Sequence, residues 1–300
     1  MSQAVAFVTG ATGYQGGATA RELLKAGFKF HALVRDSSTE SAVELQRLGV
    51  DLFPGDFDNI SSIKIAIEGA TAVFLNVLPI VSDTKREVIH ARNIIDTATA
   101  SGTVTSIVYS SVTMTGKHEE FPNWSSEYPL AWYWLNKAQI ESMVRESDIK
   151  YWTILRPAKL MNSYHQPKAS FMLPDLVQRR PDTAMTMLDP DDVEKFAVAA
   201  ITEPLAFNTH EIDLGVESLT PAEIAQELSR VSGKNIGLEF YSEQEARDLA
   251  SRGRKLYAEL WANEVGYQVD FRELEKYPIR LTKFADYLEK HRDEVLQTFG

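Results

Sequence analysis

Three glycines near the amino terminus constrain this chain more than any other feature. Gly10, Gly13 and Gly16 separate an apolar, strand-like stretch, Ala4 to Val8, from a helix-like stretch, Gly17 to Ala26. Glycine at these places allows a tight strand-to-helix turn, close approach of the backbone to a ligand, and close helix packing. The helix amino end then faces an anion. The turn therefore predicts a pyrophosphate site for a dinucleotide. The residues expected to form it are Gly10, Thr12, Gly13, Tyr14, Gln15 and Gly16.

The spacing is Gly-x-x-Gly-x-x-Gly, and an ordinary glycine-rich turn stays open as an alternative. The end of the second predicted strand, Phe28 to Val34, bears on the choice because Arg35 and Asp36 follow it. An arginine there suits the 2′-phosphate of NADP, whereas an acid suits the ribose hydroxyls of NAD. Because Arg35 comes first, we expect NADP. Asp36 keeps NAD open, and a solvated pair of charges is the remaining interpretation.

Strand and helix patterns alternate through the first half of the chain. Such alternation predicts right-handed crossovers and an α/β fold with a doubly wound parallel sheet. Strands that are apolar throughout indicate helices on both faces of the sheet. The strands are expected at residues 4–9, 28–34, 50–53, 72–78, 106–111 and 151–155. A long helix is expected from Asp83 to Ser101, ended by Gly102.

The pattern changes after Pro157. Residues 158–187 show little periodicity, while 191–201 are typical of a helix and 210–214 of a strand. Thr220 to Glu223 form a capping box at the start of a helix. We predict a dinucleotide-binding domain over residues 1–157, to which 188–214 return. A smaller, helix-rich lobe for substrate or partner is expected from 158–187 and 215–300, at the carboxyl edge of the sheet.

Polar residues follow two further strands. Asp56, with Phe57 behind it, comes after the third strand and is a candidate for binding the adenine amino group; a turn or helix-cap role is equally consistent with its position. Asn76 falls late in the fourth strand and is a candidate for the nicotinamide ribose. A polar core residue satisfied by its neighbours is the alternative for Asn76.

The candidate chemistry lies at Ser111, Tyr133 and Lys137. Ser111 ends the fifth strand, and Tyr133 and Lys137 share one face of the next helix. A phenol with a pKa near ~10 exchanges protons poorly at neutral pH, and a nearby ammonium lowers that pKa. We expect Tyr133 to protonate a carbonyl oxygen, Ser111 to hydrogen-bond it, and Lys137 to assist Tyr133 and hold the nicotinamide ribose. An aromatic helix face with a solvated lysine is the alternative.

Composition excludes several other chemistries. The chain has 300 residues and no cysteine, so thiolate metal sites and a cysteine nucleophile are absent. Its six histidines form no His-x-x-x-His pair, and we expect no metal site. A net charge of −11 disfavours nucleic acid and anionic membranes as direct partners. Neither a secretory signal nor an apolar run long enough to span a bilayer is recognised, so we expect a cytoplasmic protein.

The ordered set of motifs resembles the atypical, NmrA-like branch of the short-chain dehydrogenases/reductases. It comprises the segments 10–16, 33–36, 55–56, 110–111 and 155–157, together with Lys137, Asp192-Val193 and 219–224. The resemblance covers nearly the whole chain and implies a Rossmann-type sheet that binds NADP(H). Some members of that branch resemble reductases of phenylpropanoids or quinones. Others are regarded as redox sensors that regulate partner proteins, and these often lack the tyrosine.

Tyr133 favours an enzyme, an NADP-dependent oxidoreductase that reduces a carbonyl, enone or quinone. A non-enzymatic NAD(P)(H) redox sensor with a protein partner is the alternative, and a non-redox enzyme on the same fold is a third. The aromatic segment from Phe121 to Trp134 lines a pocket for an apolar or aromatic substrate or else packs between the lobes. The sequence leaves open whether the chain forms a homo-oligomer.

Overall fold

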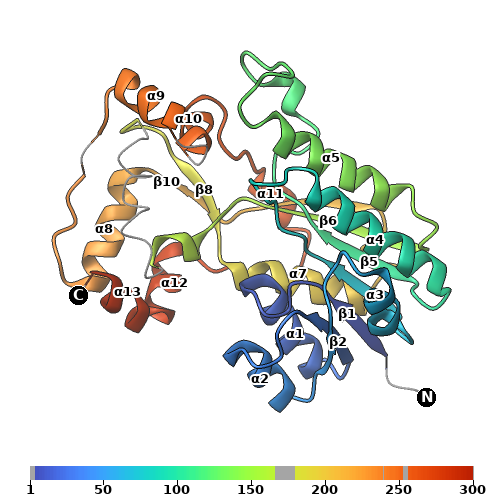
Figure 1. Cartoon of the computed structure of the whole chain (residues 1–300). Coiled ribbons are helices and arrows are strands. Elements are labelled where there is room, and N and C mark those ends of the chain that lie inside the picture. The colour runs from blue at the N-terminus through green and yellow to red at the C-terminus, as the bar shows by residue number, and fades with distance from the viewer. Residues whose placement is uncertain (1–3, 166–179, 239, 253–255, 300) are drawn as a thin grey trace. The chain divides into compact units, whose positions relative to one another are not determined.

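The structure, a computed structural model, describes residues 4–165, 180–238, 240–252 and 256–299. It divides into two compact units, which are described separately below (Figure 1). The first unit consists of Met1–Thr115, Trp132–Arg156 and Asp191–Ile212. The second consists of Gly116–Ala131, Pro157–Pro190 and Asp213–Gly300. The segment Gly116–Ala131 thus groups with the second unit.

A seven-stranded sheet runs through the first unit in the order β3-β2-β1-β4-β5-β6-β9. The pairings β1–β2, β1–β4, β2–β3, β4–β5 and β5–β6 are parallel. This arrangement confirms the predicted doubly wound parallel sheet. The strands are β1 (Val5–Val8), β2 (Lys29–Val34), β3 (Asp51–Pro54), β4 (Ala72–Leu75), β5 (Ser106–Ser110), β6 (Tyr151–Pro157) and β9 (His210–Leu214).

Helices cover both faces of this sheet (Figure 1). On one face, buried residues of α3, α4 and α5 form a single apolar core with alternate residues of the strands, such as Phe7, Val73 and Ile107. On the other face lie α1, α2 and α7, whose buried residues include Leu23 and Phe196. The helices are α1 (Tyr14–Lys25), α2 (Glu40–Arg47), α3 (Ile60–Ile67), α4 (Arg86–Ser101), α5 (Ala131–Arg145) and α7 (Pro190–Thr202).

Several boundaries differ from expectation, since α4 begins at Arg86 and not at Asp83, and β6 ends at Pro157 and not at residue 155. Two further differences have a local cause. Helix α1 begins at Tyr14 and not at Gly17, with Gly13 as its extended N-cap. Strand β4 ends at Leu75 and not at residue 78, because the Asn76 N–H donates to Thr9 Oγ1 at 2.6 Å and so leaves the ladder. Asn76 therefore lies just beyond the strand. The predicted end of α4 is confirmed, since Gly102 adopts the left-handed conformation at φ 66°.

The second unit contains a small sheet that the sequence pattern did not predict. Its order is β10-β8-β7, with β10 antiparallel and β7 parallel to β8. Strands β7 and β10, of two and three residues, are too short to show a periodicity in the sequence. The elements of this unit are η1 (His118–Glu120), β7 (Lys159–Leu160), η2 (Met161–Tyr164), β8 (Met185–Leu188), β10 (Glu217–Leu219), α8 (Pro221–Ser232), α9 (Glu243–Arg252), α10 (Leu256–Glu264), α11 (Phe271–Leu274), α12 (Phe284–Lys290) and α13 (Arg292–Phe299).

An apolar cluster holds this unit together. Side chains of η2, β8, α8, α12 and α13 meet there, including Met161, Met187, Leu228, Phe284 and Val295. The predicted capping box at Thr220 is present, and Ser242 and Glu245 form a second set of reciprocal hydrogen bonds of the same kind. Across the described part of the chain, no helix combines the length and the apolar character that a bilayer span requires.

Candidate functional site

The glycine turn leaves its backbone open. Gly10 has φ +64°, a conformation that L side chains rarely adopt. A Cβ at Gly16 would lie 2.3 Å from the Gly10 carbonyl oxygen, and one at Gly13 would lie 3.2 Å from the same atom. Gly13, the N-cap of α1, is exposed and provides no side-chain cap. The first N–H groups of α1 therefore lack a capping side chain, which is the arrangement that binds phosphate at a helix amino end.

This turn lies at the point where the strand order reverses. Strand β1 is flanked by β2 on one side and β4 on the other, and ligands of such sheets bind in the crevice between the two halves. The Thr9 hydroxyl joins the ends of β1 and β4 by donating to the Asn76 carbonyl at 3.0 Å. A Cβ on Gly10 would lie 3.9 Å from Asn76 Nδ2. Asn76 is thus placed beside the glycine turn. The Tyr14 and Gln15 side chains fall outside the described part of the structure.

At the end of β2, Arg35 and Asp36 differ in their contacts. The Asp36 carboxylate accepts hydrogen bonds from the Ser38 N–H at 2.8 Å and the Ser38 hydroxyl at 2.6 Å. These two hydrogen bonds lower the pKa of Asp36. Asp36 therefore closes a local turn, whereas the Arg35 side chain is exposed beside it.

Asp56 also closes a turn. Its carboxylate accepts from the N–H groups of Asp58 at 3.0 Å and Asn59 at 3.1 Å. Asn59, and not Asp56, is the N-cap of α3. The neighbouring Phe57 packs partly against the apolar core, with its ring centroid 5.7 Å from that of His90. The contacts of Asp56 favour the turn interpretation, and the adenine role stays a prediction.

Ser111 directly follows β5 and is bonded to a buried acid. Its hydroxyl donates to Glu141 Oε1 at 2.8 Å, and the Glu141 side chain is 1% exposed. Glu141 also accepts from Arg156 Nε at 2.8 Å and from Arg145 Nη2 at 2.7 Å. Glu211 completes the network through Arg145 and Arg156. The Ser111 hydroxyl is therefore engaged with a carboxylate that two guanidinium groups neutralise.

Lys137 is paired in the same way. Its Nζ lies 2.7 Å from Glu87 Oε1, and both side chains are buried. The same Nζ lies 5.9 Å from the centroid of the Tyr133 ring and 5.7 Å from that of Tyr109. The predicted proximity of Lys137 to Tyr133 is present, but the Glu87 carboxylate offsets the positive charge of the lysine. Burial raises the pKa of Tyr109 well above its usual value, and the charges of Glu87 and Glu141 raise it further.

Sequence reasoning missed the two acids at this site. Glu141 stands four residues after Lys137 and eight after Tyr133, so one face of α5 carries all three side chains. The four-residue spacing between Lys137 and Glu141 could have identified Glu141 from the sequence. Glu87 lies on α4 and reaches Lys137 only through tertiary packing, so no local pattern identifies it.

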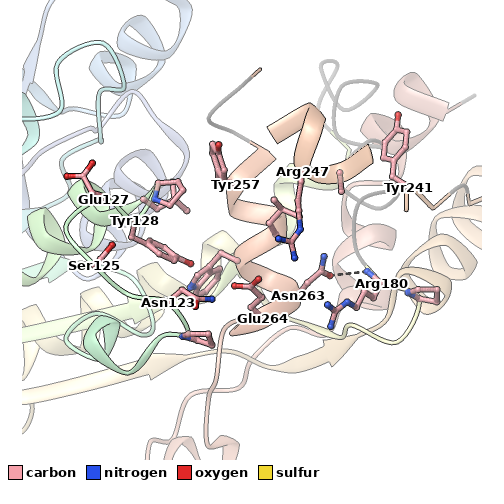
Figure 2. Close-up of a pocket in the computed structure, with 17 residues that line it drawn as sticks. Asn123, Ser125, Glu127, Tyr128, Arg180, Tyr241, Arg247, Tyr257, Asn263 and Glu264 are labelled. Carbon is pink, nitrogen blue, oxygen red and sulfur yellow. Dashed lines mark hydrogen bonds between the residues drawn. The ribbon is translucent and has the colours of Figure 1, made fainter. Parts of the chain in front are cut away.

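The second unit contains a pocket of about 370 Å³ (Figure 2). One wall comes from residues 122–130, and the other comes from α9 and α10 together with Arg180, Pro181 and Tyr241. Tyr128, Tyr257 and Trp261 supply aromatic surface, and Arg180, Arg247, Glu127 and Glu264 supply charge. Burial raises the pKa of Tyr128 to about 12, with a further contribution from the Glu264 charge. Tyr128 is thus neutral over the physiological range.

The predicted aromatic segment is divided between the two units. Tyr128 lines the pocket, and Trp124 packs beside it with ring centroids 5.3 Å apart. Phe121 packs on Trp261, with centroids 5.9 Å apart. Trp132 and Trp134 belong to α5 in the first unit, where Trp134 is fully buried. One residue of the segment, Tyr128, therefore lines the pocket, whereas Trp134 packs in the core.

Comparison with known proteins identifies the family. The model of the NmrA-like family matches residues 2–288, so the chain belongs to the NmrA-like family. An NAD(P)H azoreductase of Xenophilus azovorans is 29% identical over 235 residues, which cover 76% of this chain and 74% of the relative. The chain resembles the crystal structure of the Citrobacter triphenylmethane reductase with NADP(H), with a TM-score of 0.75, 22% identity and coverage of 96% and 99%. It also resembles NmrA, a negative transcriptional regulator, in complex with NAD, with a TM-score of 0.67, 21% identity and coverage of 100% and 96%.

Proposed function

We propose that this protein is an NADP-dependent oxidoreductase that reduces a carbonyl, enone or quinone group of a small aromatic compound. The glycine turn at the β1–β4 reversal carries the proposal, because a Cβ at Gly16 would lie only 2.3 Å from the Gly10 carbonyl oxygen. A backbone that excludes side chains at this position suits a bound pyrophosphate. The family membership and the named activities of the azoreductase and the dye reductase support it.

The residues present fit a nicotinamide dinucleotide. The backbone of residues 10–16 would hold the pyrophosphate, and Asn76 and Lys137 the nicotinamide ribose. Arg35 would bind a 2′-phosphate, because Asp36 is already bonded to Ser38 while Arg35 is exposed. Asp56 and Phe57 would adjoin the adenine. When bound and reduced, the cofactor supplies a hydride to the substrate.

The chain itself would supply the proton. Tyr133 is half-buried and lies near Lys137, so its hydroxyl is the proposed donor to the substrate oxygen. Lys137, held by Glu87, would orient the phenol and the ribose. Ser111 would hydrogen-bond the substrate oxygen only after exchanging its bond to Glu141. That exchange has a cost, since Glu141 is buried and charged.

The pocket of the second unit supports an aromatic substrate. Its volume of about 370 Å³ is within the range of small-molecule sites, and its walls combine aromatic rings with a few charged groups. We propose that the Leu260→Trp variant, which fills this pocket, raises KM at least about tenfold while the cofactor Kd stays unchanged. Leu205→Trp is the matched control, because Leu205 is exposed and lies in the first unit.

A redox sensor with a protein partner is the second candidate. It is favoured by one observation: Ser111 is hydrogen-bonded and Lys137 is ion-paired to a buried carboxylate, as residues with a structural role would be. The structural likeness to a transcriptional regulator bound to NAD agrees with this candidate. A sensor would bind the oxidised and reduced cofactors and turn over neither.

Tyr133→Phe separates the candidates. Calorimetry with NADPH and NADH would measure binding, and loss of NADPH absorbance across quinones, enones and aryl ketones would measure turnover. We expect the variant to bind NADPH normally and to lose at least about 100-fold in kcat, within the range of general acid catalysis. Tyr151→Phe, at the start of β6, is the control. Binding without turnover by the unmodified protein would favour the sensor, and absence of binding would contradict both candidates.

A further inference from the structure

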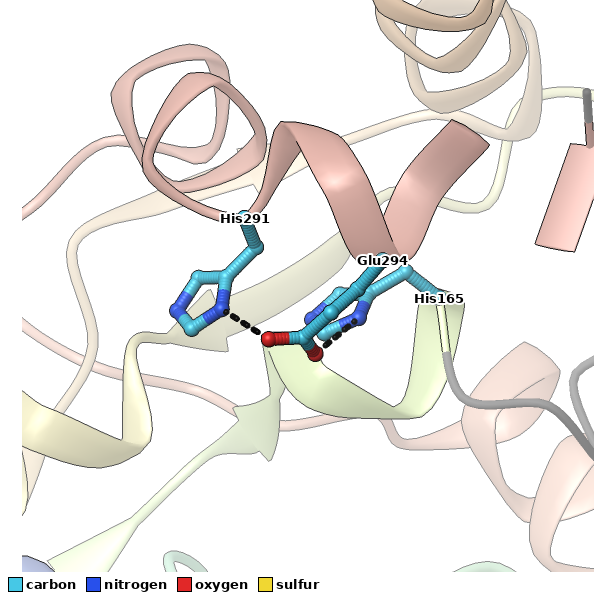
Figure 3. Close-up of side chains that lie close together, drawn as sticks. All are labelled: His165, His291 and Glu294. Carbon is cyan, nitrogen blue, oxygen red and sulfur yellow. Dashed lines mark hydrogen bonds and ion pairs between the residues drawn. The ribbon is translucent and has the colours of Figure 1, made fainter. Parts of the chain in front are cut away.

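Two histidines and a glutamate that are far apart in the sequence meet in the second unit (Figure 3). His165 follows η2, His291 is the C-cap of α12, and Glu294 lies in the first turn of α13. One potential ligand atom from each side chain lies within 4.8 Å of the other two. None of the three takes part in the proposed reduction.

The distances suit a small cation between the three groups. His165 Nδ1 lies 3.1 Å from Glu294 Oε2, and His291 Nδ1 lies 3.1 Å from Glu294 Oε1. Figure 3 shows Nδ1 of His165 and Nδ1 of His291 facing the same carboxylate, that of Glu294. A tetrahedral Zn²⁺ with bonds of ~2.0–2.2 Å has neighbouring ligand atoms about 3.3–3.6 Å apart. The two imidazole rings are stacked, with centroids 5.1 Å apart and an angle of 18° between their planes. Binding would therefore require one ring to turn so that both Nδ1 lone pairs point to the ion.

The geometry at His165 is the second, independent observation. Its side chain is 1% exposed, yet among the described residues Nδ1 has no hydrogen-bond partner. Glu294 Oε2 is near enough but does not meet the geometry of a hydrogen bond to this nitrogen. A buried nitrogen without a hydrogen bond is costly, and the ion-pair contact with Glu294 is the interaction given for Nδ1. In a tetrahedral site the nitrogen lone pair points to the metal, and the neighbouring oxygen lies off that axis.

The surroundings of His165 prepare Nδ1 as a ligand. Its Nε2 is hydrogen-bonded to the Tyr287 hydroxyl. A proton on Nε2 that is shared with this oxygen leaves the Nδ1 lone pair free, as in metal sites where an outer hydrogen bond fixes the tautomer. The Thr298 hydroxyl donates to the His165 carbonyl at 2.7 Å and joins this backbone to α13.

We propose that His165, His291 and Glu294 bind a divalent transition-metal ion of the Zn²⁺ type, with a fourth coordination position open to solvent. Glu294 is half-exposed, at 52%, which gives an ion access from outside. The bound ion would join the segment after η2 to the carboxyl-terminal helices. This site is distinct from the proposed reductase site, because none of the three ligands lines the pocket or belongs to the residues proposed to bind cofactor.

The test uses the untagged full chain, stripped with chelator. Zn²⁺ would be titrated by calorimetry, and Co²⁺ would be added to look for the visible d–d absorption of tetrahedral coordination. We expect one strong site per chain and a thermal stabilisation that chelator reverses. His291→Gln and Glu294→Gln each remove a ligand, and Tyr287→Phe removes the outer hydrogen bond, which typically costs about 10–100-fold in affinity. His210→Gln, in the first unit, is the matched control.

Two results would overturn the proposal. One is the absence of Co²⁺ absorption and of any Zn²⁺ heat, which would leave a metal-free hydrogen-bonded cluster. The other is binding that His291→Gln, Glu294→Gln and His210→Gln weaken equally, which would place the ion elsewhere. Circular dichroism of each variant checks that the fold is intact, so a loss of affinity is not mistaken for unfolding.

Discussion

The hydroxyl of Ser111 donates a 2.8 Å hydrogen bond to Oε1 of Glu141, inside the first unit. Two arginines bond to the same carboxylate, so Glu141 is the centre of a buried charged network. The residue predicted to contact substrate is therefore tied to a group that sequence reasoning did not single out.

Glu141→Gln should destabilise the protein much more than Ser111→Ala. Removing one partner of a buried ionic network costs about 3–5 kcal/mol, because Arg145 and Arg156 lose their buried carboxylate partner and keep only the more exposed Glu211. Ser111→Ala removes one hydrogen bond to a carboxylate that keeps its arginine donors, at a cost of about 1.5 kcal/mol. Urea unfolding of both variants measures the difference. Equal costs would show that the arginines contribute little.

The buried pair of Lys137 and Glu87 should behave as a coupled unit. Lys137→Met or Glu87→Gln alone leaves an uncompensated buried charge and should lower the free energy of unfolding by about 3–5 kcal/mol. The double variant should recover much of that loss, since neither charge remains. A double-mutant cycle on urea unfolding gives the coupling free energy. A coupling energy near zero would mean that the 2.7 Å contact does not persist in solution.

Gly16→Ala should abolish or greatly weaken cofactor binding. The added Cβ would lie 2.3 Å from the Gly10 carbonyl oxygen, so the turn must move to accept it. We expect the Kd for NADPH to rise at least about tenfold, which is 1.4 kcal/mol. Gly237→Ala is the control, because a Cβ there meets nothing within 4 Å. Unchanged affinity in Gly16→Ala would place the pyrophosphate elsewhere.

Arg35 should determine the preference for NADPH over NADH. Arg35→Gln removes the exposed guanidinium at the end of β2, so the Kd for NADPH should rise about tenfold while that for NADH changes little. Arg47→Gln, on α2, carries the same loss of charge at a distance from the turn. Calorimetry with both nucleotides measures the ratio of the Kd for NADPH to the Kd for NADH. An equal rise for the two nucleotides would remove Arg35 from 2′-phosphate recognition.

Stability should fall on mild acidification. Burial lowers the pKa of His118 and of His165 below the ordinary value of 6.5. Such a histidine takes up its proton mainly when the chain unfolds, so its contribution to stability is complete above pH 6.5 and is lost as the pH falls toward the folded-state pKa. Urea unfolding between about pH 7.5 and 5.5, with chelator present, measures this loss. His118→Gln should reduce the slope of the free energy of unfolding against pH, because one titrating group is removed.

Local pattern was sufficient for the first unit. The glycine turn, the six apolar strands and the Gly102 cap each depend on residues close in sequence, and each forms, although β4 ends three residues earlier than expected. The two-residue β7 and the three-residue β10 escaped prediction because strands so short carry no period. At the candidate site, the spacing of Tyr133 and Lys137 on α5 was readable, and it places the lysine near the phenol ring.

The sequence by itself determined the order of elements, the open backbone at Gly10 to Gly16 and the shared helix face of Tyr133 and Lys137, because these follow from periods of two and 3.6 residues and from glycine geometry. Only the tertiary structure decided which charged residues surround that helix face. Glu87 reaches Lys137 from another helix, and His165 meets His291 and Glu294 across the second unit. Contacts between distant segments depend on packing, and no short-range pattern encodes them.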